Sequence, residues 1–281
     1  MTGSSPAPDQ EQPPMIDVSV PHTARIWNYW LGGTDNYPAD REAGEQYVAL
    51  IPGIADTARA VRAFLTRVVR HLAGEAGIRQ FLDIGTGLPT VNNTHEVAQA
   101  IAPACRVVYV DNDQLVLSHA RALLTSSPQG VTDYLDADLH EPETILRYAA
   151  RTLDFTQPVA LMLLGVINHI MDTDQARAII DRLLDALAPG SYLVVSHPTA
   201  EIDGPGMLEA MRLYNEASGT PPITARSRQE LIRFFDGLEL LEPGVVPASR
   251  WRPSDIGDPV DVYEFCGVGR VPEQRDGSFG A

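Results

Sequence analysis

Lysine is absent from this chain of 281 residues, and all 21 of its basic residues are arginine. The absence excludes two classes of site. A P-loop nucleotide triphosphatase needs a lysine on the phosphates, and a Schiff-base enzyme needs a lysine amine. With 37 acidic residues the net charge is −16, which repels the phosphate backbone of nucleic acids. We therefore expect no nucleic-acid partner.

Cysteines and long apolar runs are also scarce. The two cysteines, Cys105 and Cys266, lie in apolar strand-like segments and suit buried thiols in a reducing cytoplasm. Neither has metal-ligand spacing with a histidine, so no metal site is predicted. No apolar run approaches the roughly 18–20 residues that span a bilayer, and residues 1–14 lack the apolar core of a secretion signal. These features predict a cytoplasmic protein with no membrane partner.

Strand-like and helical periods alternate along most of the chain. Residues 1–14 are rich in Pro, Ser and Gln and are expected to be disordered. Residues 15–54 form a segment dense in aromatic side chains. Residues 55–281 alternate short apolar runs with amphipathic stretches of about ten to fifteen residues. This alternation predicts one α/β domain with a doubly wound, mostly parallel sheet and an N-terminal extension.

The expected elements follow from these periods. Strands are predicted near residues 81–84, 107–110, 131–135, 159–164, 192–196, 238–241 and 262–267, and helices near 61–72, 94–101, 114–124, 143–150, 176–187, 206–217 and 227–235. Arg59, Arg62, Arg67 and Arg70 on the first helix are predicted to form a solvated face. Ligands of doubly wound sheets bind at the carboxyl ends of the strands, so the loops there are the candidate site.

The first such loop is the turn in Phe81-Leu-Asp-Ile-Gly-Thr-Gly-Leu-Pro-Thr90. An acidic residue in a buried strand, here Asp83, costs free energy unless a donor such as a ligand ammonium binds it. Gly85 and Gly87, on either side of Thr86, allow positive φ and a close approach of backbone to ligand. The pattern is typical of a nucleotide-type cofactor site.

Acidic residues also follow the second and third strands. Asp111 can accept both ribose hydroxyls of an adenosine cofactor. Asp138 can accept from the adenine amino group, while the adjacent backbone N–H of Leu139 donates to the ring. NAD and S-adenosylmethionine share the ribose carboxylate. S-adenosylmethionine is favoured because Thr90 replaces the third glycine of the dinucleotide fingerprint, and because Asp83 would attract a methionyl ammonium and repel a pyrophosphate.

Four motifs between Val20 and Gly269 resemble those of a known family. They are His22-Thr-Ala-Arg-Ile-Trp-Asn-Tyr-Trp-Leu-Gly-Gly-Thr-Asp-Asn36, Asp83-Ile-Gly-Thr-Gly-Leu-Pro-Thr90, His95-Glu-Val-Ala-Gln99 and Val108-Tyr-Val-Asp-Asn-Asp113. The family is the bacterial S-adenosylmethionine-dependent methyltransferases long catalogued as a domain of unknown function. The resemblance implies a class I methyltransferase fold, with a seven-stranded sheet whose last strand is antiparallel. Gln114 stands where members usually have proline, which removes a rigid helix start.

The same resemblance assigns residues to the parts of the cofactor. It implies contacts to the methionyl end from Asp83, Gly85, Thr86 and Gly87, to the ribose from Asp111, and to the adenine from Asn112, Asp138 and Leu139. The aromatic segment 15–54 resembles the lid of related carboxyl methyltransferases, in which an N-terminal arginine closes over the cofactor carboxylate. Arg25 is placed to do likewise. The alternative is a helix whose Trp27 and Trp30 pack on the sheet edge while Arg25 is solvated.

Methyl transfer needs alignment and a dry pocket, and a general base only where the acceptor must lose a proton. His169, after the fourth strand, and His197, after the fifth, are the candidate bases, although either can be a structural histidine. The loop after the fourth strand lacks the Asn/Asp-Pro-Pro-aromatic tetrad of enzymes that methylate nucleobase or amide nitrogens. A small-molecule hydroxyl or carboxyl acceptor is therefore favoured, with residues 197–226 covering its pocket.

Two other functions stay open on the sequence alone. One is a non-catalytic protein that binds S-adenosylmethionine as a sensor or partner-binding module, because an acidic surface and an aromatic segment suit either role. The other is an NAD-dependent oxidoreductase. The sequence specifies neither the acceptor nor an oligomeric state.

Overall fold

The computed structural model describes residues 17–273, apart from 124, 218 and 254–257. The tail predicted to be disordered, residues 1–14, lies outside the described residues. Among the residues that are described, no helix has both the length and the apolar character needed to cross a membrane.

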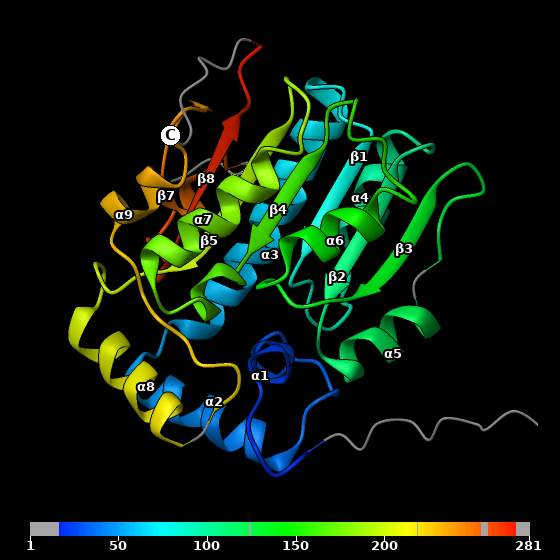
Figure 1. Cartoon of the computed structure of the whole chain (residues 1–281). Helices are drawn as coiled ribbons and strands as arrows, with labels where there is room; N and C mark the ends of the chain where they lie inside the picture. The colour runs from blue at the N-terminus through cyan, green and yellow to red at the C-terminus, as the bar shows by residue number, and fades with distance from the viewer. Residues whose placement is uncertain (1–16, 124, 218, 254–257, 274–281) are drawn as a thin grey trace, which may run out of the picture.

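A sheet of eight strands forms the centre of the described part, in the order β3-β2-β1-β4-β5-β8-β6, with β7 paired to β8 (Figure 1). The strands are β1 (Gln80–Ile84), β2 (Arg106–Asp111), β3 (Val131–Asp136), β4 (Ala160–Leu164), β5 (Tyr192–Pro198), β6 (Glu239–Leu240), β7 (Val246–Pro247) and β8 (Glu264–Arg270). The first five strands are parallel to one another, and β8 is antiparallel to β5. The predicted α/β fold with an antiparallel last strand is therefore confirmed. The sheet has one strand more than expected because β7, which was not predicted, pairs with β8 beside the predicted strand β6.

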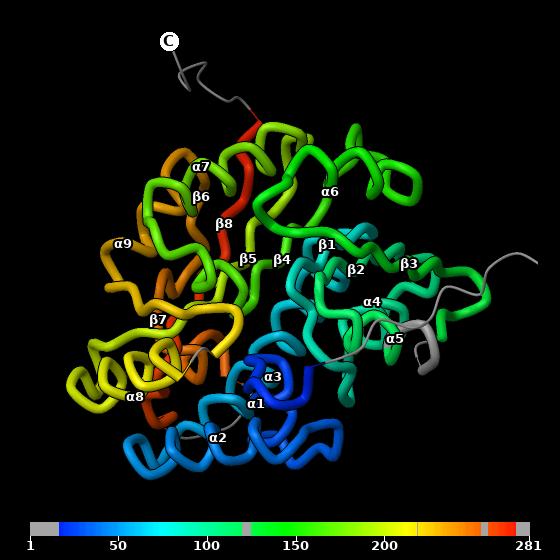
Figure 2. The backbone as a smooth tube through the Cα atoms, turned by 60° about the horizontal axis from the view of Figure 1, so that its bottom comes forward, coloured from blue at the N-terminus to red at the C-terminus, as the bar shows by residue number. Residues whose placement is uncertain are grey.

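Helices cover both faces of this sheet (Figure 2). They are α1 (Thr23–Trp30), α2 (Pro38–Leu50), α3 (Ile54–Arg70), α4 (Thr94–Ile101), α5 (Gln114–Leu123), α6 (Pro142–Ala149), α7 (Thr173–Leu184), α8 (Gly204–Glu216) and α9 (Arg228–Arg233), with shorter helical turns η1 (His71–Glu75), η2 (Ile167–His169) and η3 (Ala248–Arg250). Because successive strand residues point to opposite faces, Leu82 and Ile84 belong to a core cluster with α6, α7 and α9. Phe81 belongs to a second cluster with α3 and α4.

Three helices, α1, α2 and α8, lie beyond the carboxyl ends of the parallel strands (Figure 1). They share a third cluster of buried residues that includes Trp30, Tyr47 and Met211. Backbone hydrogen bonds tie the start of α1 to the segment after α8, since Thr220 N donates to Pro21 O at 3.2 Å and Thr23 N donates to Thr220 O at 3.4 Å. The N-terminal segment is thereby held above the edge of the sheet where ligands of this fold class bind.

Candidate functional site

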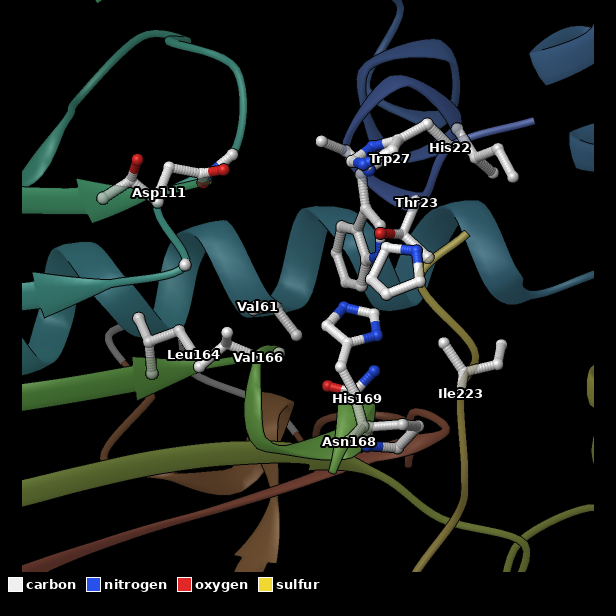
Figure 3. A pocket seen from close by; sticks show the side chains of 18 of the residues that line it. His22, Thr23, Trp27, Val61, Asp111, Leu164, Val166, Asn168, His169 and Ile223 are labelled. Carbon is white, nitrogen blue, oxygen red and sulfur yellow. Dashed lines mark hydrogen bonds between the residues drawn. The ribbon is translucent and has the colours of Figure 1, made fainter. Parts of the chain in front are cut away.

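A cavity of about 510 Å³ lies between the carboxyl ends of the strands and the helices α1, α3 and α8. Its lining includes the sequence-predicted residues Asp83, Gly85, Thr86, Gly87, Asp111, Asn112, Asp138, Leu139 and His169. Figure 3 shows Asp111 toward one end of the cavity and Ile223 toward the other, with Trp27 and His169 between them. The structure therefore brings loops from three strands to one cavity that extends well beyond them.

The turn after β1 requires glycine at one position for two reasons. Gly85 has a φ of +73°, and a Cβ atom there would lie 2.3 Å from Cγ2 of Val166. Gly87 also has a positive φ, +63°, but a Cβ atom there would meet nothing within 4 Å. Positive φ alone disfavours other residues, so Gly85 combines backbone strain with a steric limit.

Asp83 lies at the end of β1 with its side chain almost fully buried. Thr94 at the start of α4 donates a hydrogen bond to Oδ2 of Asp83 at 2.6 Å. Burial raises the pKa of Asp83 to about 6, although this hydrogen bond and the charge of Arg62 oppose the shift. A buried carboxylate in this state is well suited to receive a ligand cation, because the cation would restore its ionised form.

Asp111 ends β2 and links the first two loops. Its Oδ2 accepts from the backbone N–H of Gly87 at 3.0 Å, and its Oδ1 accepts from the N–H of Asp113 at 2.9 Å. Burial raises the pKa of Asp111 to about 6 in spite of these two hydrogen bonds. The carboxylate is therefore fixed in orientation at the edge of the cavity.

Asp138 follows β3 and is more exposed. Its Oδ1 accepts from the backbone N–H of His140 at 2.8 Å, and Asn112 donates to its Oδ2 at 3.2 Å. Partial burial acts to raise the pKa of Asp138. The hydrogen bonds from His140 lower it by more than burial raises it, so the pKa lies below its usual value. This carboxylate is an ionised acceptor at the same end of the cavity as Asp111.

Arg25 does not reach the cavity. Its Nε donates to Asp40 at 3.0 Å, and its two terminal nitrogens donate to the carbonyl oxygens of Val20 and Asp17. The residue is 3% exposed, so it is not solvated either. Both sequence-based readings of Arg25 are corrected, because its guanidinium is bonded within the N-terminal segment.

Arg62 lines the cavity from α3, and no other arginine does so among the described residues. Burial lowers its pKa, while the neighbouring Asp83 carboxylate opposes that shift. The predicted solvated face is therefore wrong at Arg62. It is also wrong at Arg67, which donates to the carbonyl oxygens of Trp251 and Ala248. The signal that was missed is spacing, since Arg62 comes four residues after buried Ala58 on one helix face.

The two candidate bases have different surroundings. His169 lines the cavity, and its Nδ1 lies 3.0 Å from the carbonyl oxygen of Pro222. Burial lowers the pKa of His169 to about 4, so the imidazole is neutral at pH 7. With the Nδ1 proton donated to Pro222, the Nε2 lone pair can accept a hydrogen bond.

His197 is fully buried and is not part of the cavity lining. Its Nε2 lies 2.7 Å from a guanidinium nitrogen of Arg226, and its Nδ1 lies 2.8 Å from the carbonyl oxygen of Pro198. Burial and the Arg226 charge lower the pKa of His197 to about 3. The expectation of a base at His197 is therefore corrected: both ring nitrogens are used inside the protein.

The chain matches the S-adenosyl methyltransferase family over residues 9–272. It belongs to this family. The methyltransferase is similar to a DUF574 family protein from Streptomyces avermitilis, with 44% identity, a TM-score of 0.86, and coverage of 91% of this chain and 99% of that one. It is also similar to a candidate methyltransferase from Thermobifida fusca, with 41% identity, a TM-score of 0.84, and coverage of 94% and 100%. No curated protein matches the chain.

Family membership confirms the predicted resemblance and the predicted cofactor, S-adenosylmethionine. The residues present fit that cofactor, because buried Asp83 and Asp111 have raised pKa values, which a bound ammonium and hydroxyl donors would lower. The described part of the methyltransferase contains no group of three or more His, Cys, Asp or Glu side chains that could hold a metal ion.

A carboxyl group that the sequence analysis did not single out also lines the cavity of the methyltransferase. Glu264 opens β8, is 1% exposed, and accepts a hydrogen bond from Ser196 Oγ at 2.6 Å. Burial raises the pKa of Glu264 to about 7. An acidic residue within an apolar strand is the same signal that identified Asp83, so the sequence does contain it.

The end of the cavity away from the acidic loops is apolar and aromatic. Its lining includes Ile26, Trp27, Trp30, Tyr47, Ile54, Met207, Met211, Tyr214, Ile223 and Tyr263. The ring of Trp30 stands edge-on to Trp27 at 6.0 Å and to Tyr47 at 5.4 Å between centroids. Four members of this lining come from residues 197–226, the segment expected to cover the acceptor pocket.

The two glycines of the N-terminal aromatic segment, Gly32 and Gly33, lie in a turn that directly follows α1. A Cβ atom on Gly33 would lie 2.4 Å from the side-chain nitrogen of Asn28. Asn36 donates to Oδ1 of Asn28 and to the carbonyl oxygen of Gly33, both at 2.9 Å. These contacts fix the end of α1, and with it the direction in which Trp27 and Trp30 project.

Proposed function

We propose that this methyltransferase transfers the methyl group of S-adenosylmethionine to a hydroxyl group of a small, mainly apolar acceptor. The main support is that one cavity joins the acidic loops after β1, β2 and β3 to an aromatic end. A hydroxyl is favoured over a carboxyl acceptor, because Glu264 in the cavity lining would repel a carboxylate. The cation that could attract a carboxylate, Arg62, lies beside Asp83 instead.

The positions of the cavity residues suggest how the cofactor binds. Asp83 would accept from the methionyl ammonium, and Asp111 from the ribose hydroxyls. The adenine would lie against Asn112, Asp138 and Leu139. The glycines and Thr86 of the β1 turn would bring backbone close to the methionyl chain.

Arg62 is proposed to bind the methionyl carboxylate in place of Arg25. Arg62 and Asp83 line the same cavity and interact electrostatically, and the methionyl end of the cofactor carries one charge of each sign, so the two side chains would form a complementary pair. Replacing Arg62 with glutamine is expected to weaken binding of S-adenosylhomocysteine about 10- to 100-fold by calorimetry, the loss of a charge-assisted hydrogen bond.

Arg59→Gln is the matched control for Arg62. Arg59 lies one turn earlier on α3, is exposed, and pairs with Asp56. Its replacement is expected to leave cofactor affinity unchanged. Equal affinities for the two variants would contradict the role of Arg62.

His169 and the apolar side chains around the acceptor would orient its hydroxyl group and keep water out. When bound, the cofactor would supply a methyl carbon attached to a sulfonium. Nε2 of His169 would accept a hydrogen bond from the acceptor hydroxyl and take up its proton as the oxygen is methylated, while the bond from Nδ1 to Pro222 holds the ring in place. The surrounding apolar side chains exclude water.

Replacing His169 with glutamine is expected to lower kcat/KM for the acceptor about 100-fold, the typical contribution of a positioned proton acceptor. The dissociation constant of S-adenosylhomocysteine is expected to stay the same, because the cofactor contacts come from other loops. Full turnover by His169→Gln would remove this residue from the mechanism.

Methyl transfer itself is tested by incubating the protein with S-adenosylmethionine and a panel of small phenols and alcohols. S-adenosylhomocysteine is expected to accumulate only when an acceptor is added. Tight cofactor binding without product from any member of the panel would contradict the proposal and favour the non-catalytic sensor.

A further inference from the structure

The carboxyl group of Glu264 has no cationic partner within the described part of the chain. It is 1% exposed, and Ser196 on β5 is the donor that the structure shows for it. Burial raises the pKa of Glu264, and the hydrogen bond from Ser196 opposes that shift. A buried carboxylate is costly unless a cation or several donors compensate it. Because Glu264 lines the cavity, a ligand can supply that compensation.

The position of Glu264 connects the two ends of the cavity. Val166 packs directly on Gly85 of the β1 turn, and Gly165 immediately precedes it. A Cβ atom on Gly165 would lie 3.7 Å from Oε1 of Glu264. The carboxyl group therefore lies next to residues 165–166, which pack on the turn after β1. In the strand order this position is on the opposite side of β1 from Asp111 and Asp138.

A second acceptor atom without a partner lines the same cavity. Oδ1 of Asn168 is buried and accepts no hydrogen bond from the residues that the structure describes, and the side chain belongs to a residue that is 6% exposed. Asn168 lies in η2, three residues after Gly165, and Figure 3 shows it beside His169 below the cavity. A carboxylate and an amide oxygen only accept hydrogen bonds, whereas an ammonium group has three donors and accepts none.

Aromatic rings that line the same cavity suit a cation as well. Trp27, Trp30, Tyr47 and Tyr214 form a continuous set of ring contacts, with Tyr47 and Tyr214 6.4 Å apart between centroids. Faces of such rings attract ammonium groups, most strongly where water is excluded.

From these contacts we propose that the acceptor carries a primary ammonium group, which Glu264 and Asn168 bind in the part of the cavity between the β1 turn and the aromatic end. The inference rests on the proposed function, because it adds an anchoring group to the same hydroxyl acceptor. The substrate class is thus a small aromatic or apolar molecule that bears both an amine and a hydroxyl.

The ionisation of Glu264 fits such a ligand. Its pKa is raised to about 7 by burial, with Ser196 opposing the shift, and the titratable group electrostatically linked to it is buried Cys266. An ammonium ligand would favour the ionised carboxylate, so binding near pH 7 would release a proton.

Three phenols that differ at one group provide the first test. Tyramine carries an ammonium, 4-propylphenol has a methyl group in its place, and 4-hydroxyphenylacetate carries a carboxylate. With the protein saturated with S-adenosylhomocysteine, calorimetry at pH 8 is expected to show tyramine binding at least tenfold tighter than either analogue. Glu264→Gln is expected to remove that preference, and Asn168→Ala to reduce it.

Glu42→Gln, an exposed position on α2, is the matched control and is expected to keep the preference for tyramine. The wild-type protein gives a second, variant-independent measurement in case Glu264→Gln does not fold. Tyramine affinity is expected to rise about tenfold from pH 6 to pH 8, because a carboxyl of pKa about 7 ionises over this range while the amine stays protonated. Proton release is measured from the buffer dependence of the binding enthalpy.

The proposal is overturned if wild-type protein binds tyramine no better than 4-propylphenol, or if Glu264→Gln folds and keeps the preference. It is also overturned if tyramine affinity is the same at pH 6 and pH 8. Binding of S-adenosylhomocysteine is measured first in every sample. If wild-type protein does not bind S-adenosylhomocysteine, the proposed function is refuted. If it binds S-adenosylhomocysteine but does not prefer tyramine, only the ammonium site is refuted.

Discussion

Replacing Asp83 with asparagine is expected to weaken S-adenosylmethionine binding at least about 100-fold and to raise the melting temperature of the cofactor-free protein. The first effect follows from removing one partner of a buried charge pair, which costs about 2–5 kcal/mol. The second follows from burial, which raises the pKa of Asp83 to about 6 from about 3.9 in an unfolded chain. Calorimetry and thermal unfolding measure the two effects separately.

The sign of the stability change follows from proton binding. Since the folded pKa of Asp83 is raised, the native state binds the proton more tightly, and the free energy of unfolding falls as pH rises from about 4 to about 6. Above that range ionised Asp83 costs about 3 kcal/mol, at about 1.4 kcal/mol per pKa unit. Asparagine lacks this cost and can still accept the hydrogen bond from Thr94.

The cofactor affinity of the wild-type protein should depend on pH for the same reason. Below about pH 6 the carboxyl is protonated and no longer attracts an ammonium, so affinity is expected to fall in acid. Asp174→Asn, at an exposed position on α7, is the control and should leave both measurements unchanged. An unchanged dissociation constant for Asp83→Asn, or a lower melting temperature, would contradict the role of Asp83.

Replacing Gly85 with alanine is expected to cost about 2–5 kcal/mol, divided between a lower melting temperature and weaker cofactor binding. Positive φ costs a residue with a Cβ atom about 1–2 kcal/mol, and overpacking adds about 1–3 kcal/mol. The overlap would be with Val166, 2.3 Å from the new Cβ atom. Thermal unfolding and calorimetry with S-adenosylhomocysteine measure the two parts.

Gly87→Ala separates backbone strain from the clash. Its φ is also positive, but the space around its Cβ position is open, so only about 1–2 kcal/mol is expected. Removing the Val166 side chain in the double variant Gly85→Ala/Val166→Gly should recover part of the loss. Equal effects of alanine at positions 85 and 87, or no recovery in the double variant, would contradict the steric argument.

The cofactor end of the site is predictable from sequence because its signals are local. Asp83 and Asp111 lie at the ends of parallel strands and Asp138 follows one, and parallel strands end at one edge of a sheet. The helix predicted over residues 94–101 has those bounds in the structure. By contrast, β7 has two residues, one of them a proline, which is too short to show a period.

The errors concern side chains whose partners are distant in sequence. The ion pair with Asp40 sets the orientation of the Arg25 side chain, and the contact with Arg226 sets that of His197. Neither pairing produces a periodic pattern in the sequence. Arg62 and Glu264 do leave one, since each is a charged residue within a buried pattern. Side-chain direction at the acceptor end depends on which helices meet there, and that is a property of the tertiary fold.

The tie between the start of α1 and Thr220 has a consequence for how the protein is made. The loops after β1, β2 and β3 are encoded within the first half of the chain, whereas the aromatic end needs both the N-terminal helix and the segment after α8. During synthesis α1 can pack against α2 and α3 soon after it leaves the ribosome, but its backbone hydrogen bonds with Thr220 must wait until that late segment emerges. Contacts of such long sequence separation form slowly, so the acceptor end is assembled last.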